Sequence, residues 1–222
     1  MKMQPNYEAA ATAAMHLLIE NNVIATPIDA LSILLSRPGV RVMTFSEMAT
    51  ETGTDRDDLV PLFGKNQDAV TFKLPQAFDG VDYVVIYNRF LSVDIVSRGI
   101  ARELGHIVMG HDGQTRPADV RMAEALCFSH HLLSPRPVIR LLQESGLRIT
   151  LDILAETTGC SSDCVKGLQA IPGVHVPKEI NRMVKEQFAQ EIMEYVRFRS
   201  ASNKTDTSQI IDFGSFMDNY ED

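Results

Sequence analysis

Two helical segments, over residues 91–111 and 118–133, lie on either side of a short connection that contains Gly110, Gly113 and Pro117. A connection of this length favours neighbouring antiparallel helices. Such a pair brings side chains that are distant in the sequence to one place on its facing sides. We therefore expect any chemistry of this chain to lie on these two helices.

The N-terminal part of the chain mixes helical and β-rich segments. Ala-rich sequence predicts a helix over residues 5–22, and Thr26 before Pro27 and Asp29 predicts a second helix, with Thr26 as its N-cap, that ends near residue 36. Further expected elements are a strand at 40–45, a polar helical stretch at 46–63, and strands at 69–74 and 82–87 joined by a turn over 75–80.

Everything after residue 137 has a helical pattern. Pro135 and Pro137 break the chain, and turns are expected at Gly146, Gly159 and residues 172–173. These elements together predict an α+β fold, in which a small β-sheet packs on a helical core that holds the 91–111 helix and a helical C-terminal region follows.

Composition narrows the classes of function. Hydrophobic residues make up 45% and charged residues 23% of the 222 residues, which is typical of a globular chain. The net charge of −8 argues against nucleic acid as a partner, because phosphates need a basic surface. The chain has three cysteines and no apolar run of the roughly 18 residues that cross a bilayer, so we expect a cytoplasmic protein with no membrane contact.

The sequence Arg102-Glu103-Leu104-Gly105-His106 lies in the first helix of the pair. In an H-E-x-x-H helix the two histidines share one face and bind zinc, while the glutamate activates the metal-bound water. Here Arg102 stands in place of the first histidine. Glu124, 18 positions after His106, is placed on the second helix where it can face the same point.

These residues resemble the ImmA/IrrE-like metallopeptidases, which are encoded on phages, conjugative elements and bacterial chromosomes. The family pattern A-H-E-L-G-H followed by G-H stands here as A-R-E-L-G-H at 101–106 and Gly110-His111. The second pattern, E-A-N-x-F-A-x-x-L-L-x-P, stands as E-A-L-C-F-S-H-H-L-L-S-P at 124–135, and the strand that ends in Asn88 is also similar.

The resemblance implies a metallopeptidase-like domain over residues 1–136. The helical pattern predicts a helical C-terminal region with a helix-turn-helix-like shape over 137–199, and the polar, acidic composition predicts a flexible tail over 200–222. The resemblance further implies that His106 and Glu124 are zinc ligands and that Glu103 is the general base. It also implies cleavage of a regulatory protein, namely a repressor with a helix-turn-helix. A homologue with these residues would hydrolyse a peptide bond if it is active.

Arg102 changes what the resemblance implies for zinc. A guanidinium stays protonated and has no lone pair to offer a metal, so zinc binding is expected to be weak or absent. Without a dication Glu103 and Glu124 would repel each other, and Arg102 can supply the positive charge by pairing with Glu124 across the helices or with Glu103 beside it. The alternative function is therefore a catalytically inactive pseudo-peptidase that binds a protein partner.

Other residues of this region leave further interpretations open. His111 and His131 are additional candidates for the pocket, and His130 is next to His131 in the sequence, although the pattern favours a surface or helix-end role for each of them over a ligand role. The whole 102–106 segment can also be an amphipathic core helix. That interpretation does not account for the second motif.

Two features of the C-terminal region suggest other functions. Ala155, Gly159 and Val165 have helix-turn-helix spacing, with a second helix over 161–170, but the mixed charge there is poor for DNA binding and favours packing or a protein contact. Cys160 and Cys164 are one helical turn apart, and without a second pair they are better read as thiols than as a metal site.

Overall fold

The structure, a computed structural model, describes residues 3–55, 57–59, 68–112, 116–161 and 174–201. Its elements in chain order are α1 (Tyr7–Glu20), α2 (Ala30–Leu35), β1 (Val40–Thr44), α3 (Phe45–Thr52), β2 (Ala69–Phe78), β3 (Val81–Tyr87), α5 (Val93–Val108), α6 (Ala118–Leu133), α7 (Arg136–Glu144), α8 (Leu151–Thr158) and α10 (Lys178–Ala201). The small sheet with its helical core and helical C-terminal region confirms the predicted α+β fold.

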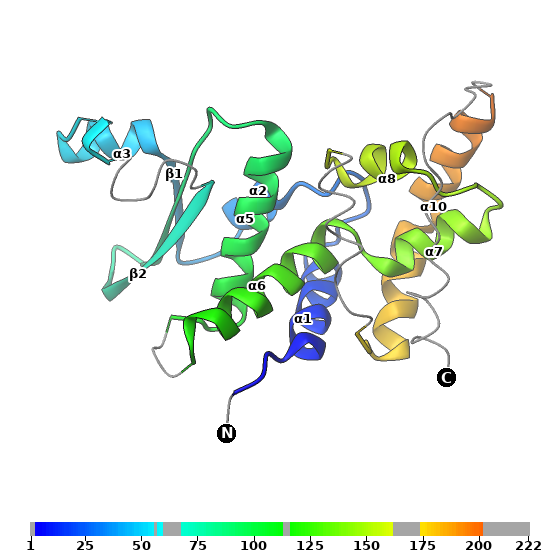
Figure 1. The fold of residues 1–222 in the computed structure, drawn as a ribbon, viewed down its shortest axis with the longest axis horizontal. Coiled ribbons are helices and arrows are strands. Elements are labelled where there is room, and N and C mark those ends of the chain that lie inside the picture. Colours follow the sequence, from blue (N-terminus) through cyan, green and yellow to red (C-terminus); the bar gives the residue numbers. More distant parts are fainter. Residues whose placement is uncertain (1–2, 56, 60–67, 113–115, 162–173, 202–222) are drawn as a thin grey trace.

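The sheet has three strands in the order β1-β3-β2 (Figure 1). β1 pairs with β3 in parallel, and β2 pairs with β3 as an antiparallel hairpin. The hairpin turns at Asp79 and Gly80, both at positive φ, so Pro75 lies within β2 and not in the predicted turn. The register shifts between Lys73 and Phe78, and β2 is an edge strand, which are the conditions under which a sheet tolerates proline.

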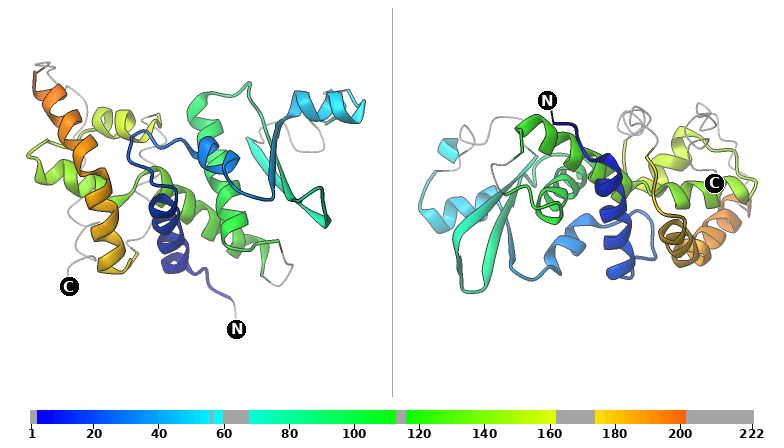
Figure 2. Two further views of the ribbon diagram at one scale, coloured as in Figure 1. Left: turned by 180° about the vertical axis from the view of Figure 1, so that it is seen from behind. Right: turned by 90° about the horizontal axis from the view of Figure 1, so that it is seen from below.

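α5 and α6 lie side by side in the middle of the molecule (Figures 1 and 2). α5 contacts β2 and β3 on one side and α6 on the other, and α1 covers α6. The helices approach closely at Gly105, where a Cβ would lie 3.0 Å from Cδ1 of Phe128. The predicted antiparallel pair is therefore present, and it holds α5 against the sheet.

One continuous set of buried apolar side chains joins the two ends of the molecule. It includes Leu104 of α5, Phe128 of α6, Leu18 of α1, Leu154 of α8 and Phe188 of α10. The C-terminal helices α7, α8 and α10 gather at the end of the molecule opposite the sheet (Figure 2). The domain boundary at 136 and 137 stays a prediction.

Several element ends differ from the predictions for local reasons. α2 begins at Ala30 because Asp29, not Thr26, caps it by accepting from the N–H groups of Leu31 and Ser32. α3 ends at Thr52 because the next residue, Gly53, adopts a positive φ of 64°, so the predicted helical stretch over 46–63 is not one helix. Pro137 lies in the first turn of α7, where proline fits a helix start.

Parts of some predictions fall outside the residues that the structure describes. These are Cys164, most of the second helix of the helix-turn-helix over 161–170, the turn at 172–173, and the tail after Ala201. α8 and the positive-φ Gly159 that follows it are present as predicted.

Candidate functional site

A pocket of about 480 Å³ opens between β2, α5 and the first turn of α6. Its polar lining residues include Lys73, Tyr83, Arg102, Glu103, His106, His111, Asp112 and Arg121. Three of the five predicted site positions, Glu103, His106 and His111, therefore line one pocket together with Arg102. Glu124 and His131 do not line it.

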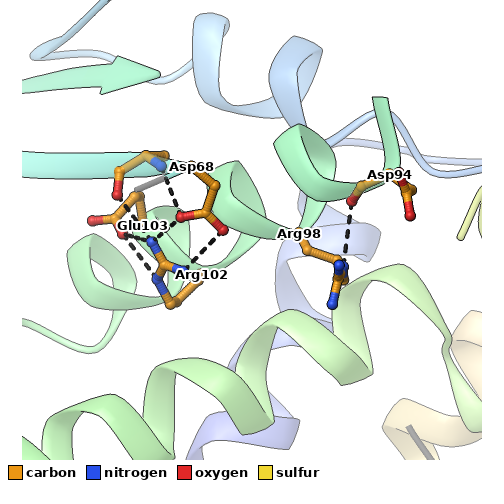
Figure 3. A network of polar contacts seen from close by, with 6 residues as sticks. Asp68, Asp94, Arg98, Arg102 and Glu103 are labelled. Atoms are coloured by element: carbon orange, nitrogen blue, oxygen red, sulfur yellow. Dashed lines mark hydrogen bonds and ion pairs between the residues drawn. The ribbon is translucent and has the colours of Figure 1, made fainter. Parts of the chain in front are cut away.

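Two carboxylates, those of Asp68 and Glu103, hold Arg102 (Figure 3). Its Nη1 and Nη2 donate to the two carboxylate oxygens of Asp68 at 3.1 and 2.7 Å. Its Nε and Nη2 donate to Oε1 of Glu103 at 3.0 and 2.8 Å, and Nη2 also donates to the carbonyl oxygen of Ala69. Arg102 therefore ties α5 to the first residues of β2.

Asp68 reaches Arg102 because the backbone of α5 leaves room for it. Asp68 precedes β2, its carbonyl oxygen accepts from the N–H of Asn88, and its carboxylate accepts from the N–H of Ala69. On the helix, Gly99 stands one turn before Arg102, and a Cβ there would lie 2.7 Å from Cγ of Asp68. Nothing in the local sequence marks Asp68 as a partner of Arg102, since 34 residues separate the two.

The charges of this cluster are not balanced, because one guanidinium faces two carboxylates. Glu103 is 5% exposed, and burial raises its pKa even though Arg102 acts in the opposite direction. For Arg102, burial alone would lower the pKa, but its bonds to Asp68 and the charge of Glu103 raise it. Arg102 therefore stays charged, and its bonds hold the side chain that the resemblance makes the general base.

His106 and His111 meet because the chain reverses directly after α5. Gly110 has a positive φ of 64°, and the N–H of His111 then donates to the carbonyl oxygen of His106 at 2.9 Å. The two rings stand edge to face, with Nδ1 of His106 3.0 Å from Nδ1 of His111. Nε2 of His111 lies 2.8 Å from Oε2 of Glu124.

These contacts fix the tautomers of both rings. Burial alone would raise the pKa of Glu124, but hydrogen bonds from the Asn6 N–H, His111 and Arg116 lower it, so the carboxylate is ionised and only accepts. His111 must then donate from Nε2 and, as a neutral ring, accept at Nδ1 from Nδ1–H of His106. Nε2 of His106 is left with a lone pair and has no hydrogen-bond partner among the described residues.

The protonation of both rings follows from their surroundings. Burial lowers the pKa of His106 to about 4, and the positive charges of Arg102 and Arg121 act in the same direction. Burial also lowers the pKa of His111, against the opposing effect of Glu124. Both rings are therefore neutral near pH 7.

Glu124 lies behind His111 and is 1% exposed. It accepts from Nη1 of Arg116 at 2.8 and 2.7 Å and from the N–H of Asn6 at 2.8 Å. The predicted ion pair between Arg102 and Glu124 is wrong. Glu124 pairs instead with Arg116 of the connecting segment, and Arg102 pairs with Asp68 and Glu103. The alternative partner predicted for Arg102, Glu103, is in contact.

His131 and His130 are not part of the pocket. His131 is buried, and its Nδ1 donates to the carbonyl oxygen of Cys127 one turn earlier in α6. Burial lowers the pKa of each ring to about 4. Cys127 and Cys160 are buried thiols. None of these side chains lines the pocket.

The donor set does not fit tetrahedral zinc. Arg102 has no lone pair, and Glu124 is held by donors from Asn6, His111 and Arg116. Of the three ligand positions of the family motif, only His106 therefore has a free lone pair, on Nε2, and a zinc site needs at least three protein ligands. In the part of the chain that the structure describes, no three His, Cys, Asp or Glu side chains are grouped so as to hold a metal ion. A catalytic step through zinc therefore has no support in this geometry.

Four further polar residues line the pocket without any signal in the sequence that would have singled them out, namely Lys73, Tyr83, Asp112 and Arg121. Asp112 accepts hydrogen bonds from Lys73 and, at 2.7 Å, from the hydroxyl of Tyr83. The positive charge of Lys73 is therefore balanced by the carboxylate of Asp112. Arg121 donates from Nη1 to the carbonyl oxygen of His111 at 2.9 Å, but its buried Nε has no partner. No described carboxylate forms an ion pair with Arg121.

Comparisons of this chain with protein families, with curated proteins and with solved structures find no significant match. No helix among the described residues is long and apolar enough to span a membrane.

Proposed function

We propose that this chain is a catalytically inactive pseudo-peptidase of the ImmA/IrrE-like type, which works without zinc and binds a protein partner in the cytoplasm. The partner expected from the resemblance is a regulatory protein or repressor with a helix-turn-helix. The observation that carries the proposal is the guanidinium of Arg102, which stands at the first-ligand position and binds Asp68 and Glu103.

Two arginines provide the positive charge that a metal would contribute. Arg102 forms ion pairs with Asp68 and Glu103, and Arg116 forms an ion pair with Glu124. Buried or half-buried carboxylates need such partners, because an uncompensated charge in this environment is costly. Each acidic residue of the ancestral zinc site thus has a protein cation, which supports a role that needs the shape of the pocket and not hydrolysis.

The exposed surface beside the pocket fits contact with a protein. Met122 lines the pocket and is 43% exposed, and Leu126, one turn further along α6, is 42% exposed. Apolar side chains at this spacing form a strip on one helix face. The proposal uses this strip as part of the partner surface.

Zinc content tests the inactive state against the active one. Protein purified without added metal and dialysed should hold clearly less than one zinc per chain by elemental analysis, and it should not cleave a general substrate such as casein. Arg102→His should bind zinc more tightly than the parent, because positions 102 and 106 share one helix face. Arg98→His, one turn earlier on α5 and outside the pocket, is the matched control. Stoichiometric zinc in the dialysed parent would overturn the proposal in favour of a metallopeptidase.

Partner binding is tested by cross-linking in cells of the natural source. A repressor-type protein should be recovered with the parent chain and lost with Met122→Glu. Met193→Glu, on α10 and also exposed, is the control, and it should leave recovery unchanged. Equal recovery with both variants would contradict a partner surface at the pocket.

A further inference from the structure

Arg121 is the one lining residue whose positive charge has no carboxylate partner in the described part of the chain. Lys73 is matched by Asp112, and Arg102 by Asp68 and Glu103. Arg121 donates from Nη1 to the carbonyl oxygen of His111, which fixes its direction, while Nη2 makes no hydrogen bond with a described residue. A guanidinium that is oriented but not neutralised is suited to bind an anion from solution.

The position of this charge relative to the two rings is also defined. Nη1 of Arg121 lies 2.9 Å from the carbonyl oxygen of His111, and Arg121 lines the same pocket as His106 and His111. His106 offers the lone pair of Nε2, which needs a donor. The pocket therefore presents a cation for an anion and, near it, an acceptor for an N–H or O–H.

The lining around Glu103 has acidic character. Arg102 places both of its bonds to Glu103 on Oε1, so Oε2 is not bonded to Arg102, and this cluster holds one more carboxylate than guanidinium. An anion is therefore favoured at Arg121 and disfavoured at Glu103. A ligand that fits the pocket carries a negative charge for Arg121 and N–H donors for the other polar groups.

We infer that this pocket binds a carboxylate at Arg121, with an N–H of the same ligand donated to Nε2 of His106. The C-terminal residue of a polypeptide has this chemistry, and so does a free N-acyl amino acid. The inference deepens the proposed function and rests on it in one respect, namely that no metal fills the pocket. It names the group by which the pocket recognises its ligand.

The test compares acids with their amides on protein that has been dialysed against a chelator. Acetyl-Ala-Ala with a free carboxylate should bind at least about tenfold more tightly than acetyl-Ala-Ala-amide in a calorimetric titration, because the charge-assisted bonds to the guanidinium are lost in the amide. The same pair of end groups on an eight-residue peptide distinguishes the two sources. A chain terminus is indicated if the long acid binds as well as the short one, and a small ligand if only the short acid binds.

Variants of Arg121 test whether this residue binds the carboxylate of the ligand. Arg121→Gln should abolish the preference for the acid, while Arg98→Gln should keep it, and the thermal unfolding of each variant shows whether it is folded. Arg121→Lys keeps the charge without the planar fork and should retain part of the preference. Equal binding of acid and amide to the parent, no binding of either, or an unchanged preference in a folded Arg121→Gln would overturn the inference. None of these results depends on the zinc content of the parent, so failure here is separate from failure of the proposed function.

Discussion

Gly99 and Asp68 share one small space, since a Cβ at position 99 would lie 2.7 Å from Cγ and 2.9 Å from Cβ of Asp68. Contacts this short do not occur between such atoms in folded proteins. The absence of a side chain on α5 at this turn is therefore what lets the Asp68 carboxylate reach Arg102.

Gly99→Ala should destabilise the fold by about 1–3 kcal/mol, because Asp68 must move away from Arg102 to make room. In an Asp68→Gly background the same change should be neutral or stabilising by up to about 1 kcal/mol, since alanine is the better helix former. Urea unfolding of the four proteins in the cycle measures both effects. An equal loss in the two backgrounds would mean that Asp68 is not what limits position 99.

Arg102→Met should lower the free energy of unfolding by about 2–4 kcal/mol, because it leaves two carboxylates of a partly buried cluster without their cation. Arg41→Met is the matched control, since Arg41 pairs with Glu51 at an exposed site and should cost at most about 1 kcal/mol. Denaturant unfolding at neutral pH compares the two. Similar small losses would show that Arg102 contributes little to the fold.

The stability of the protein should fall as the pH drops from about 6.5 to about 4. Burial lowers the pKa of His106, His130 and His131 from 6.5 to about 4. Between these two pH values the histidines bind protons in the unfolded chain but stay neutral in the folded chain, so protonation favours unfolding. Each of the three should cost on the order of 1–2 kcal/mol at pH 5. His131→Gln should flatten the measured slope, with His16→Gln, an exposed site on α1, as the reference for the substitution itself. A slope that is unchanged in His131→Gln contradicts the assignment.

Glu124→Gln should cost about 2–4 kcal/mol, because the amide nitrogen presents donors where His111 and Arg116 also donate. Glu144→Gln, at an exposed pair with Lys185, should cost at most about 1 kcal/mol. Hydrogen exchange adds a local readout, since the Asn6 amide should lose protection in Glu124→Gln. Retained protection at Asn6 would indicate that this amide does not depend on the Glu124 carboxylate.

The sequence predicted the parts of the site that are encoded locally. The bounds of α6, 118–133, agree with the structure because Pro117 and Pro135 mark its two ends. The spacing of Arg102, Glu103 and His106 along one helix needs no tertiary information, and these three side chains do line one pocket. Helix periodicity and strong end signals are thus sufficient for the framework.

Contacts between distant segments could not be read in the same way. Asp68 precedes an edge strand and gives no local signal, and it meets Arg102 only because Gly99 is small. The pairing of Arg102 with Glu124 was predicted from charge alone, and it failed because Arg116 is the nearer cation in the folded chain. Opposite charges identify possible partners, while loop paths and side-chain volume decide which of them meet.

The N–H of Asn6, just before α1, donates to Oε1 of Glu124, and Oε2 of the same carboxylate accepts from His111. A force on the residues before α1 therefore reaches the ring of His111 through this carboxylate. A fusion or a bound protein at this end of the chain would act on the chemistry of a pocket that it does not touch.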